Sequence, residues 1–524
     1  MNWLPSYIRG PSDILVKHTL KEKKMTLNAY MDKFMERFKY TGLTFDDVSL
    51  ITQYADFKPA EADLSTRLTR NIRMNAPFIS AAMDTVTEAE MAIAMAQLGG
   101  IGIVHKNLTP YDQRTQVKRV KYYLNGFLKK ARTLLPHNTL NDMFELKERK
   151  KFKFSSFPIL DENRHLVGVV TSREIKYCEN TDAAMKDIMI ENPISAPEGT
   201  TIEEAFDIMR KNKISILPIL DENEIFAGMY CYKDVREILQ AIHPDYNMDD
   251  EHKLRCGAAI GPGDYERVEC LMESICDVFV VDTAHGHSKG VIEMTKWIKD
   301  NYPEVDVIAG NIASGEAVPD LIRAGADGVK VGVGPGSICT TRVVAGIGVP
   351  QITAIYECVK AAQDEIPIIA DGGVRYSGDV AKALAAGAST VMMGGVLAGT
   401  DQSPGEKILY KGRRYVVYRG MGSLEAMKER AGSRERYGQT DVTPEKLVPE
   451  GIEGMVPYAG EVSEVMQQFI GGLRNSLGYN GCKSVDDLRE KGRFVKVTSA
   501  GYKESHPHDI TVTKDAPNYK MEQR

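Results

Sequence analysis

The feature that most constrains the fold of this chain is a series of short apolar runs, each followed by a helix or a long loop. A strand-helix-strand order favours parallel pairing, because a parallel crossover needs a dozen or more residues. Eight such units favour a closed barrel over an open sheet. A partial internal echo between residues 324–332 and 386–394 supports the repetition. We therefore predict an α/β fold with a (β/α)8 TIM barrel, whose strands are residues 75–83, 99–105, 257–260, 278–282, 307–311, 329–333, 368–371 and 391–393.

A different repeat interrupts this pattern from about residue 120 to residue 240. Residues 157–163, Phe-Pro-Ile-Leu-Asp-Glu-Asn, recur at 217–223 with only the first residue changed to leucine. Before each copy, apolar residues at helical spacing predict an amphipathic helix, and Thr201 with Glu204 has the spacing of a capping box. The expected apolar faces are Leu140, Met143 and Phe144 in one helix and Ile202, Ala205, Phe206 and Met209 in the other.

We expect this repeat to be inserted between the second and third barrel strands. The predicted domains are 1–122, the first part of the barrel with a polar leader to about residue 40, then 123–240, the inserted unit, and 241–524, the second part of the barrel.

Composition narrows the class of function. The 524 residues carry a net charge of −6, which gives no electrostatic reason to expect nucleic acid or an acidic membrane as a partner. The eight cysteines include no Cys-x-x-Cys pair, so we expect reduced thiols in a cytoplasmic protein. Charges and prolines interrupt the amino-terminal segment, which is therefore not expected to be a secretory signal. The apolar residues 381–399 include Lys382 and many small residues, so we expect a helix, a strand and a loop there rather than a membrane span.

A glycine-rich loop follows the sixth predicted strand and carries a cysteine. Residues 332–342 are Gly-Val-Gly-Pro-Gly-Ser-Ile-Cys-Thr-Thr-Arg, and such a loop can bring main chain close to a ligand. A free cysteine is usually a small buried hydrophobe. However, Cys339 lies among polar residues, and Arg342 with free amide groups would favour a thiolate. We therefore predict that Cys339 is a nucleophile.

Two glycine pairs follow the last two predicted strands, at Gly372–Gly373 and Gly394–Gly395. A single pair of this kind is usually a turn. At consecutive strand ends of a barrel, however, such glycines let amide groups approach a phosphate. Asp371 precedes them and can accept both hydroxyls of a ribose, so together they predict a nucleoside monophosphate site.

Asp282 ends the fourth predicted strand, and two histidines follow it in a polar loop. His285 and His287 lack an evident third ligand, so we expect no metal there. No Gly-x-Gly-x-x-Gly follows a strand, so a bound dinucleotide would not be held in the Rossmann manner.

The charged segment 428–456 has the composition of a mobile surface loop, which enzyme lids share. It contains Arg436 and Tyr437. Its Glu450 is either a solvated carboxylate or a site residue, and residue chemistry alone leaves both open.

The loop of residues 332–342 resembles the active-site signature shared by IMP dehydrogenase and GMP reductase, and the similarity extends over nearly the whole chain. The Arg436–Tyr437 pair resembles IMP dehydrogenases in particular, because GMP reductases lack it. Gly438 departs from the aromatic residue of many relatives, which leaves the packing of the lid open. The resemblance implies NAD-dependent oxidation of IMP to XMP, the committed step of guanine nucleotide synthesis. The implied nucleotide contacts are Ser337, Asp371, Gly372, Gly373, Gly394, Gly395, Tyr418, Arg419, Gly420, Met421, Gly422 and Glu450.

In the mechanism that the resemblance implies, the Cys339 thiolate adds to C2 of IMP, hydride passes to NAD, and a covalent thioimidate remains. The lid then enters the vacated cofactor site, where Arg436, with Tyr437, acts as the base that activates water. An ordinary arginine is always protonated, so this role needs a strong perturbation. Thr341 helps to orient the water, and Glu450 offers a second proton route. The implied cofactor contacts are Asp282, Asn311, Gly332, Val333 and Gly334.

The resemblance also implies a monovalent cation, usually potassium, held by main-chain carbonyl oxygens. Half of its ligands would come from the tail of a neighbouring subunit, which implies a homotetramer and leaves an octamer open. The implied ligands are Gly334, Gly336, Cys339, Glu504, Ser505 and His506.

The inserted repeat resembles a tandem pair of CBS modules, which in other proteins bind adenine or guanine nucleotides. Asp234 matches the aspartate that contacts ribose in that family, whereas the first copy has Glu174. The substitution weakens the case for one of the two nucleotide sites. A packing or tethering insert is the alternative.

Two other functions stay open. GMP reductase shares the cysteine, the threonine and the nucleotide pocket, but it uses NADPH. A non-catalytic nucleotide sensor would use the inserted modules and a decayed barrel.

Overall fold

The computed structural model describes residues 41–123, 126–128, 131–150, 156–239, 245–429, 431–440, 442–514 and 516–519. The predicted polar leader lies outside these residues. The elements below belong to the compact unit Leu43–Arg524.

Eight parallel strands close into a barrel in the order β13-β14-β15-β16-β17-β18-β4-β5, which confirms the predicted TIM barrel. The strands are almost entirely apolar because both of their faces are covered. Ile103, Val280 and Ile308 fill the interior, while Val281 and Ala309 belong to the core between strands and helices. The strands are β4 Phe78–Ser80, β5 Ile101–Val104, β13 Cys256–Ile260, β14 Val278–Asp282, β15 Asp306–Ile312, β16 Gly328–Val331, β17 Ile368–Asp371 and β18 Thr390–Met393.

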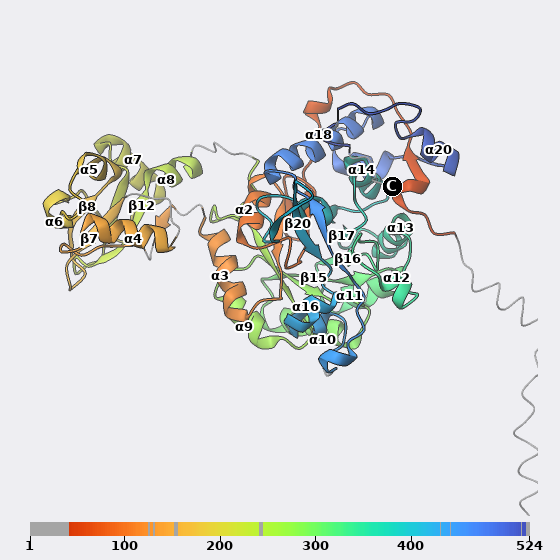
Figure 1. Cartoon of the computed structure of the whole chain (residues 1–524), viewed down its shortest axis with the longest axis horizontal. Helices are drawn as coiled ribbons and strands as arrows, with labels where there is room; N and C mark the ends of the chain where they lie inside the picture. Colours follow the sequence, from red (N-terminus) through yellow and green to blue (C-terminus); the bar gives the residue numbers. More distant parts are fainter. Residues whose placement is uncertain are drawn as a thin grey trace, which may run out of the picture. The chain divides into compact units, whose positions relative to one another are not determined.

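Helices surround the barrel strands (Figure 1). In α18, Val462, Met466, Phe469, Leu473 and Leu477 recur at three- or four-residue spacing and are all buried, as an amphipathic helix requires. The apolar run 381–399 forms parts of α14 and β18, as predicted, but it ends in the short helix α15 where a loop was expected. The helices of this part are α2 Ala89–Gln97, α3 Pro110–Lys121, α9 Tyr265–Met272, α10 Lys289–Asn301, α11 Val318–Arg323, α12 Thr341–Val344, α13 Gln351–Ala362, α14 Ser377–Ala385, α15 Gly395–Ala398, α18 Val462–Asn480 and α19 Val485–Lys491.

The start of α2 lacks a local side-chain cap. Glu88 occupies the N-cap but makes no side-chain cap hydrogen bond. The Thr87 hydroxyl donates instead to the carbonyl oxygen of Ala81, at 2.7 Å. The amide of Ala89 donates to Gln116 Oε1 on α3, at 3.1 Å. A tertiary contact therefore satisfies the helix start in place of a local cap.

Between β5 and β13 the chain forms two smaller sheets, with the strand orders β10-β11-β12-β6 and β7-β8-β9. The two sequence repeats occupy equivalent positions, because each begins an antiparallel hairpin, β7 with β8 and β11 with β12. Both hairpins also have a register irregularity at the same point, Ile159/Leu160 and Ile219/Leu220. The strands are β6 Phe127–Leu128, β7 Phe157–Leu160, β8 Leu166–Val170, β9 Ile190–Glu191, β10 Ala196–Pro197, β11 Ile216–Leu220 and β12 Phe226–Cys231.

The two helices predicted before the repeats are present as α4 and α7, and one predicted apolar position differs. The Thr201–Glu204 capping box is present at the start of α7. Phe144 on α4 is 39% exposed, although the sequence places it on the apolar face. The buried stripe of α4 is therefore narrower than predicted, with Leu140 and Met143 in the core. The helices are α4 Leu140–Lys150, α5 Ser172–Tyr177, α6 Met185–Ile188, α7 Ile202–Asn212 and α8 Tyr232–Leu239.

The predicted lid, residues 428–456, overlaps the segment that connects β20, Arg413–Arg419, to β21, Glu453–Pro457. This connecting segment, residues 420–452, is called the lid below. These strands pair antiparallel from Arg419 with Glu453, so both ends of the lid are fixed at one place. The lid contains α16 Leu424–Glu429, α17 Ala431–Arg436 and the 3-10 helix η5 Pro444–Lys446. The other elements are β1 Val48–Leu50, β2 Thr66–Arg67, β3 Arg73–Met74, β19 Lys407–Tyr410, β22 Phe494–Lys496, α20 Ser499–Glu504 and the 3-10 helices η2 Phe45–Asp47, η3 Pro59–Glu61 and η4 Gly315–Ala317.

Among the residues that the structure describes, no helix has both the length and the apolar character needed to cross a membrane.

Candidate active site

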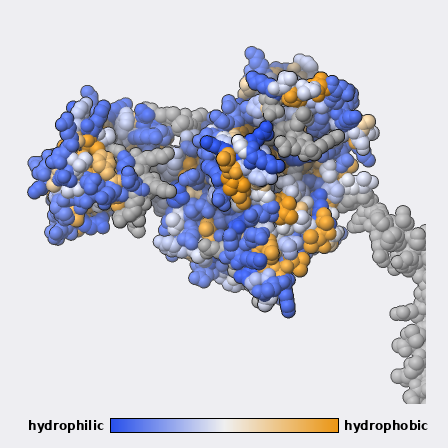
Figure 2. Space-filling model, in the orientation of Figure 1, coloured by the Kyte–Doolittle hydropathy of each residue, from blue (hydrophilic) through white to orange (hydrophobic). Residues whose placement is uncertain are grey.

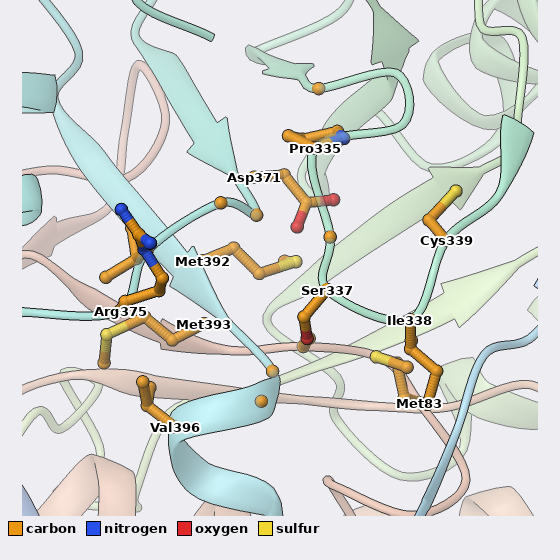
Figure 3. A pocket seen from close by; sticks show the side chains of 18 of the residues that line it. Met83, Pro335, Ser337, Ile338, Cys339, Asp371, Arg375, Met392, Met393 and Val396 are labelled. Carbon is orange, nitrogen blue, oxygen red and sulfur yellow. The ribbon is translucent and has the colours of Figure 1, made fainter. Parts of the chain in front are cut away.

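A cavity of about 1130 Å³ lies at the carboxyl ends of the barrel strands. Its wall includes Asn311 from β15, Gly332 after β16 and Asp371 from β17. This edge is where TIM barrels hold their reacting groups. Figure 3 shows Cys339 on the loop that runs along one side, with Asp371 and Met392 at strand ends on the other side. The predicted residues that line the cavity are Asn311, Gly332, Val333, Gly334, Gly336, Ser337, Cys339, Thr341, Asp371, Gly372, Gly373, Gly394, Gly395, Tyr418, Gly420, Met421, Arg436, Tyr437 and Glu450.

The loop of residues 332–340, here the Cys339 loop, needs glycine where it leaves β16. Gly334 has φ of +75°, a conformation that favours glycine. A Cβ added at Gly332 would lie 2.1 Å from the carbonyl oxygen of Asp371, so the loop passes directly over the end of β17. Farther along, the amide of Cys339 donates to the carbonyl oxygen of Gly336 at 3.1 Å, which closes a turn just before α12.

The Cys339 thiol lies between a hydroxyl group and a main-chain carbonyl group. Its Sγ is 3.1 Å from Thr341 Oγ1 and 3.6 Å from the carbonyl oxygen of Glu450. That carbonyl also accepts a hydrogen bond from the amide of Thr340, at 3.0 Å. Cys339 forms an isolated antiparallel bridge with Gly451. Backbone pairing thus brings Glu450, distant in sequence, to the Cys339 loop.

Arg342 holds the Cys339 loop in shape. Its guanidinium donates to the carbonyl oxygens of Val333, at 3.1 Å, and Val349, at 2.7 Å. Burial lowers the pKa of Arg342, and negative charge on Cys339 would raise it. The predicted effect of Arg342 on the thiol stays a prediction.

A buried lysine, which the sequence analysis missed, connects the two predicted ribose carboxylates. Lys330 Nζ donates to Asp282 Oδ1 at 3.0 Å and to Asp371 Oδ2 at 2.6 Å, and it contacts Asn311 Oδ1. Asn311 Nδ2 donates to the same Asp371 oxygen at 2.9 Å. The signal was available, since a lysine inside an otherwise apolar barrel strand requires buried partners of opposite charge.

Arg436, at the end of α17, lines the same cavity as Cys339. Its guanidinium contacts Asp282 Oδ2, the carboxylate oxygen that Lys330 leaves free. Its carbonyl oxygen accepts a hydrogen bond from the amide of Ala284, at 3.0 Å. Burial lowers the pKa of Arg436, and the hydrogen bond to the neighbouring tyrosine opposes this effect.

Tyr437 lies half-buried beside Arg436, and desolvation raises the pKa of its phenol. Its ring lies over Gly422, where an added Cβ would be 2.6 Å from the tyrosine Cζ. Gly422 does not line the cavity wall. Its lack of a side chain instead leaves space for the Tyr437 ring.

The predicted phosphate end is assembled from several loops. Gly372 and Gly373 have φ of +87° and +82°. The Ser337 hydroxyl lies over Gly395, since a Cβ added there would be 3.3 Å from Ser337 Oγ. Tyr418 is hydrogen-bonded to Ser337, and burial raises the pKa of the tyrosine, so the phenol stays protonated.

The side chain of Arg419, a predicted nucleotide contact, forms ion pairs with two carboxylates. It donates to Asp84 Oδ2 at 2.8 Å and pairs with Glu429 of α16 at 2.5 Å. These two carboxylates raise its pKa. Arg419 does not line the cavity wall, and its part in nucleotide binding stays a prediction.

The predicted tail ligands of the cation lie apart from the Cys339 loop within this chain. Ser505 and His506 line a separate cavity of about 280 Å³, and Glu504 ends α20. His506 Nδ1 is 2.9 Å from the hydroxyl of Tyr519.

His287, one of the two histidines after β14, lies beside an aspartate of α11. His287 Nε2 is 2.8 Å from Asp320 Oδ2. No group of three potential ligands for a metal ion, among histidine, cysteine, aspartate and glutamate, occurs in the described part of the chain.

A family model described as the IMP dehydrogenase / GMP reductase domain matches residues 42–508. Inosine-5'-monophosphate dehydrogenase from Aquifex aeolicus is 52% identical over 484 residues, which cover 91% of this chain and 97% of that protein. The protein of the same name from Bacillus subtilis is 47% identical over 489 residues, which cover 92% of this chain and 99% of its own. A crystal structure of a Cys-to-Ala variant of Trypanosoma brucei GMP reductase, in complex with guanosine 5'-monophosphate, is similar with a TM-score of 0.83. It is 36% identical and covers 91% of this chain and 100% of that chain.

Proposed function

The chain belongs to the IMP dehydrogenase / GMP reductase family, and we propose that it oxidises IMP to XMP through a covalent bond between Cys339 and C2 of the purine. Relatives named IMP dehydrogenase share about half of their residues with it over nearly its whole length, so it is an NAD-dependent oxidoreductase of that type. The observation that carries the covalent route is that Cys339, Thr341, Arg436 and Tyr437 line one cavity.

In the first half of the reaction, Cys339 Sγ forms a bond to C2 and the ring carbon becomes tetrahedral. Hydride then leaves C2 with its electron pair, so the purine is oxidised and the thioimidate remains on the cysteine. Asp371, held by Lys330 and Asn311, presents its other carboxylate oxygen to the ribose. Ser337 and Gly395 would hold the phosphate.

NAD, when bound, accepts this hydride at its nicotinamide ring. The site fits a second ligand, since a cavity of about 1130 Å³ is larger than the roughly 300–1,000 Å³ of most small-molecule pockets. Asp282 is buried and does not line the cavity wall, so it would hold the nicotinamide ribose once Arg436 leaves its Oδ2, with Lys330 still on Oδ1. The same carboxylate contacts Arg436, so the cofactor and the lid arginine would use it in turn.

In the second half of the reaction, water adds to C2 and gives one proton to Arg436. The bond between C2 and Sγ breaks with its electron pair on sulfur, and the second proton of the water stays with XMP. Burial lowers the pKa of Arg436, which is the direction that a base requires. Thr341 Oγ1, 3.1 Å from Sγ, is close enough to orient this water.

Potassium and a homotetramer are part of the proposal. Main-chain oxygens at residues 334, 336 and 339, with 504–506 of a second subunit, are hard donors that suit such a cation. Beside the Cys339 loop, Val343 is 86% exposed and Ile347 is 62% exposed. A hydrophobic patch also lies in Figure 2 at the position that Figure 1 labels α12. An apolar surface of this kind supports contact with a second copy of the chain. A cytoplasmic location stays a prediction.

We propose that the inserted unit is a CBS pair with one nucleotide site. Glu174 is used within its own helix, since its carboxylate accepts from the Thr171 amide at 2.9 Å in a capping box. Asp234 occupies the same position of α8, which follows Cys231 instead of a threonine. Burial raises the pKa of Asp234 to about 6.

Replacing Asp234 with alanine should weaken binding of ATP or GTP roughly ten- to hundred-fold, because charged hydrogen bonds to the ribose are lost. Titration calorimetry with each nucleotide should find one nucleotide per chain in the unmodified protein. Glu174→Ala serves as the control and should leave the affinity unchanged. Two nucleotides per chain, or loss of binding in the Glu174 variant, would contradict the assignment.

The function itself is tested by mixing the protein with IMP, NAD and potassium and following NADH by its absorbance. We expect steady formation of NADH and XMP. Consumption of NADPH with GMP, and no signal with IMP, would identify a GMP reductase. Silence in both assays would favour the nucleotide sensor.

A further inference from the structure

The lid contacts the barrel through a second ion pair that the proposed chemistry does not use. The Lys106 side chain, after β5, is 2% exposed, and its Nζ lies 3.3 Å from Glu435 Oε2. Glu435 directly precedes Arg436 on α17. A buried ammonium group needs a partner, because an unpaired charge in the interior is costly.

The lid lies close to the strand ends at two glycines. A Cβ added at Gly261, which follows β13, would lie 1.8 Å from Glu435 Oε1. A Cβ added at Gly432, on α17 itself, would lie 2.8 Å from the carbonyl oxygen of Lys106. Glycine at both positions therefore leaves the space in which the Glu435 carboxylate reaches Lys106.

Lys106 has an attractive partner in Glu435 and a repulsive neighbour in Arg436. Burial lowers the pKa of Lys106 to about 8, the Glu435 carboxylate opposes this, and the positive charge of Arg436 adds to it. Without the carboxylate, Lys106 and Arg436 would repel each other across the lid contact. The docked position of α17 thus depends on the charge of Glu435.

We propose that Lys106 and Glu435 are positioning residues whose ion pair holds α17 on the barrel, so that Arg436 can act on the covalent intermediate. The inference rests on the proposed function, because it assigns the pair to the half of the reaction in which water releases XMP. Hydride transfer uses Asp282 for the cofactor, with the lid withdrawn. The pair therefore acts on hydrolysis and not on hydride transfer.

The test uses the full-length variants Glu435→Gln, Lys106→Met and the two combined, with IMP, NAD and potassium in a rapid-mixing instrument. We expect the first NADH to form at the unmodified rate, while steady-state turnover falls roughly ten-fold. Mass spectrometry of quenched enzyme should find more nucleotide bound to Cys339. The steady-state turnover of the double variant should be no lower than that of the less active single variant, because the two side chains act as one pair. Glu445→Gln, at an exposed position of the same lid, is the matched control and should behave as unmodified enzyme.

An unchanged steady-state rate in Glu435→Gln, or an equal loss in the first turnover and the steady state, would overturn the proposal. Hydrogen exchange separates its failure from failure of the base assignment. Amides of residues 431–440 should exchange faster in Glu435→Gln than in Glu445→Gln, whatever Arg436 does chemically. Equal exchange in the two variants would reject the ion pair as the lid contact, even where Lys106→Met fails to fold. Normal turnover of Arg436→Ala would reject only the assignment of Arg436 as the base, and not the ion pair.

Discussion

Replacing Cys339 with alanine is expected to abolish turnover, with a loss of roughly 10⁴-fold or more, while IMP still binds. In the proposed reaction the thiol sulfur forms the bond to C2, and Thr341 Oγ1, 3.1 Å away, is a far weaker nucleophile. Binding should persist, because the proposed ribose and phosphate contacts come from Asp371, Ser337 and Gly395. Calorimetry with IMP and an NADH absorbance assay measure the two properties separately.

Cys270→Ala is the matched control, since this cysteine is also partly exposed but lies on α9, away from the cavity wall. It should retain full activity. In unmodified enzyme quenched during turnover, mass spectrometry should find the added nucleotide on the peptide that carries Cys339. An adduct on another peptide, or near-normal turnover of Cys339→Ala, would move the nucleophile elsewhere.

The barrel could be predicted because its strands are apolar on both faces and are separated by helical segments. This periodicity is local, so it is readable in the sequence. Phe144 shows the limit of this approach. Its spacing places it on the apolar stripe of α4, yet its side chain is exposed. The width of a buried stripe depends on what packs against the helix, which the spacing does not contain.

The parts of the site that lie at strand ends could be predicted from the sequence. The barrel then gathers Cys339, Asp371 and Gly394 at one edge without further information. Glu450 could not be placed in this way, because its position depends on backbone pairing between two loops far apart in sequence. Arg419 was predicted to contact the nucleotide, but its side chain pairs with Asp84 and Glu429 instead.

Lys330 links two carboxylates that belong to different sequence motifs. It fixes one oxygen of Asp282 and one of Asp371, so the two carboxylates proposed to hold the cofactor ribose and the nucleotide ribose share a buried cation. The remaining oxygen of Asp282 contacts Arg436. In the proposed reaction the cofactor ribose and the lid arginine would use this carboxylate in turn, which would give a physical reason for the two halves of the reaction to alternate.

Replacing Arg436 with alanine should separate these halves. The first NADH is expected to form at the unmodified rate, because hydride transfer requires Cys339 and an open cofactor site, not the lid arginine. Steady-state turnover should then fall roughly 10³-fold, as for the loss of a general base, and enzyme should accumulate with nucleotide bound to Cys339. Rapid-mixing absorbance gives both rates, and mass spectrometry of quenched enzyme gives the adduct.

Lys428→Ala is the control for Arg436→Ala, because it removes a positive charge from an exposed position of the same lid. It should leave both rates unchanged. Normal steady-state turnover of Arg436→Ala would remove this arginine from the water-activating role. A slow first turnover in the same variant would contradict the alternation itself, because the lid would then be required before NADH forms. The predicted pattern, a normal first turnover followed by a stall, arises only if Arg436 enters after hydride transfer and acts on the thioimidate.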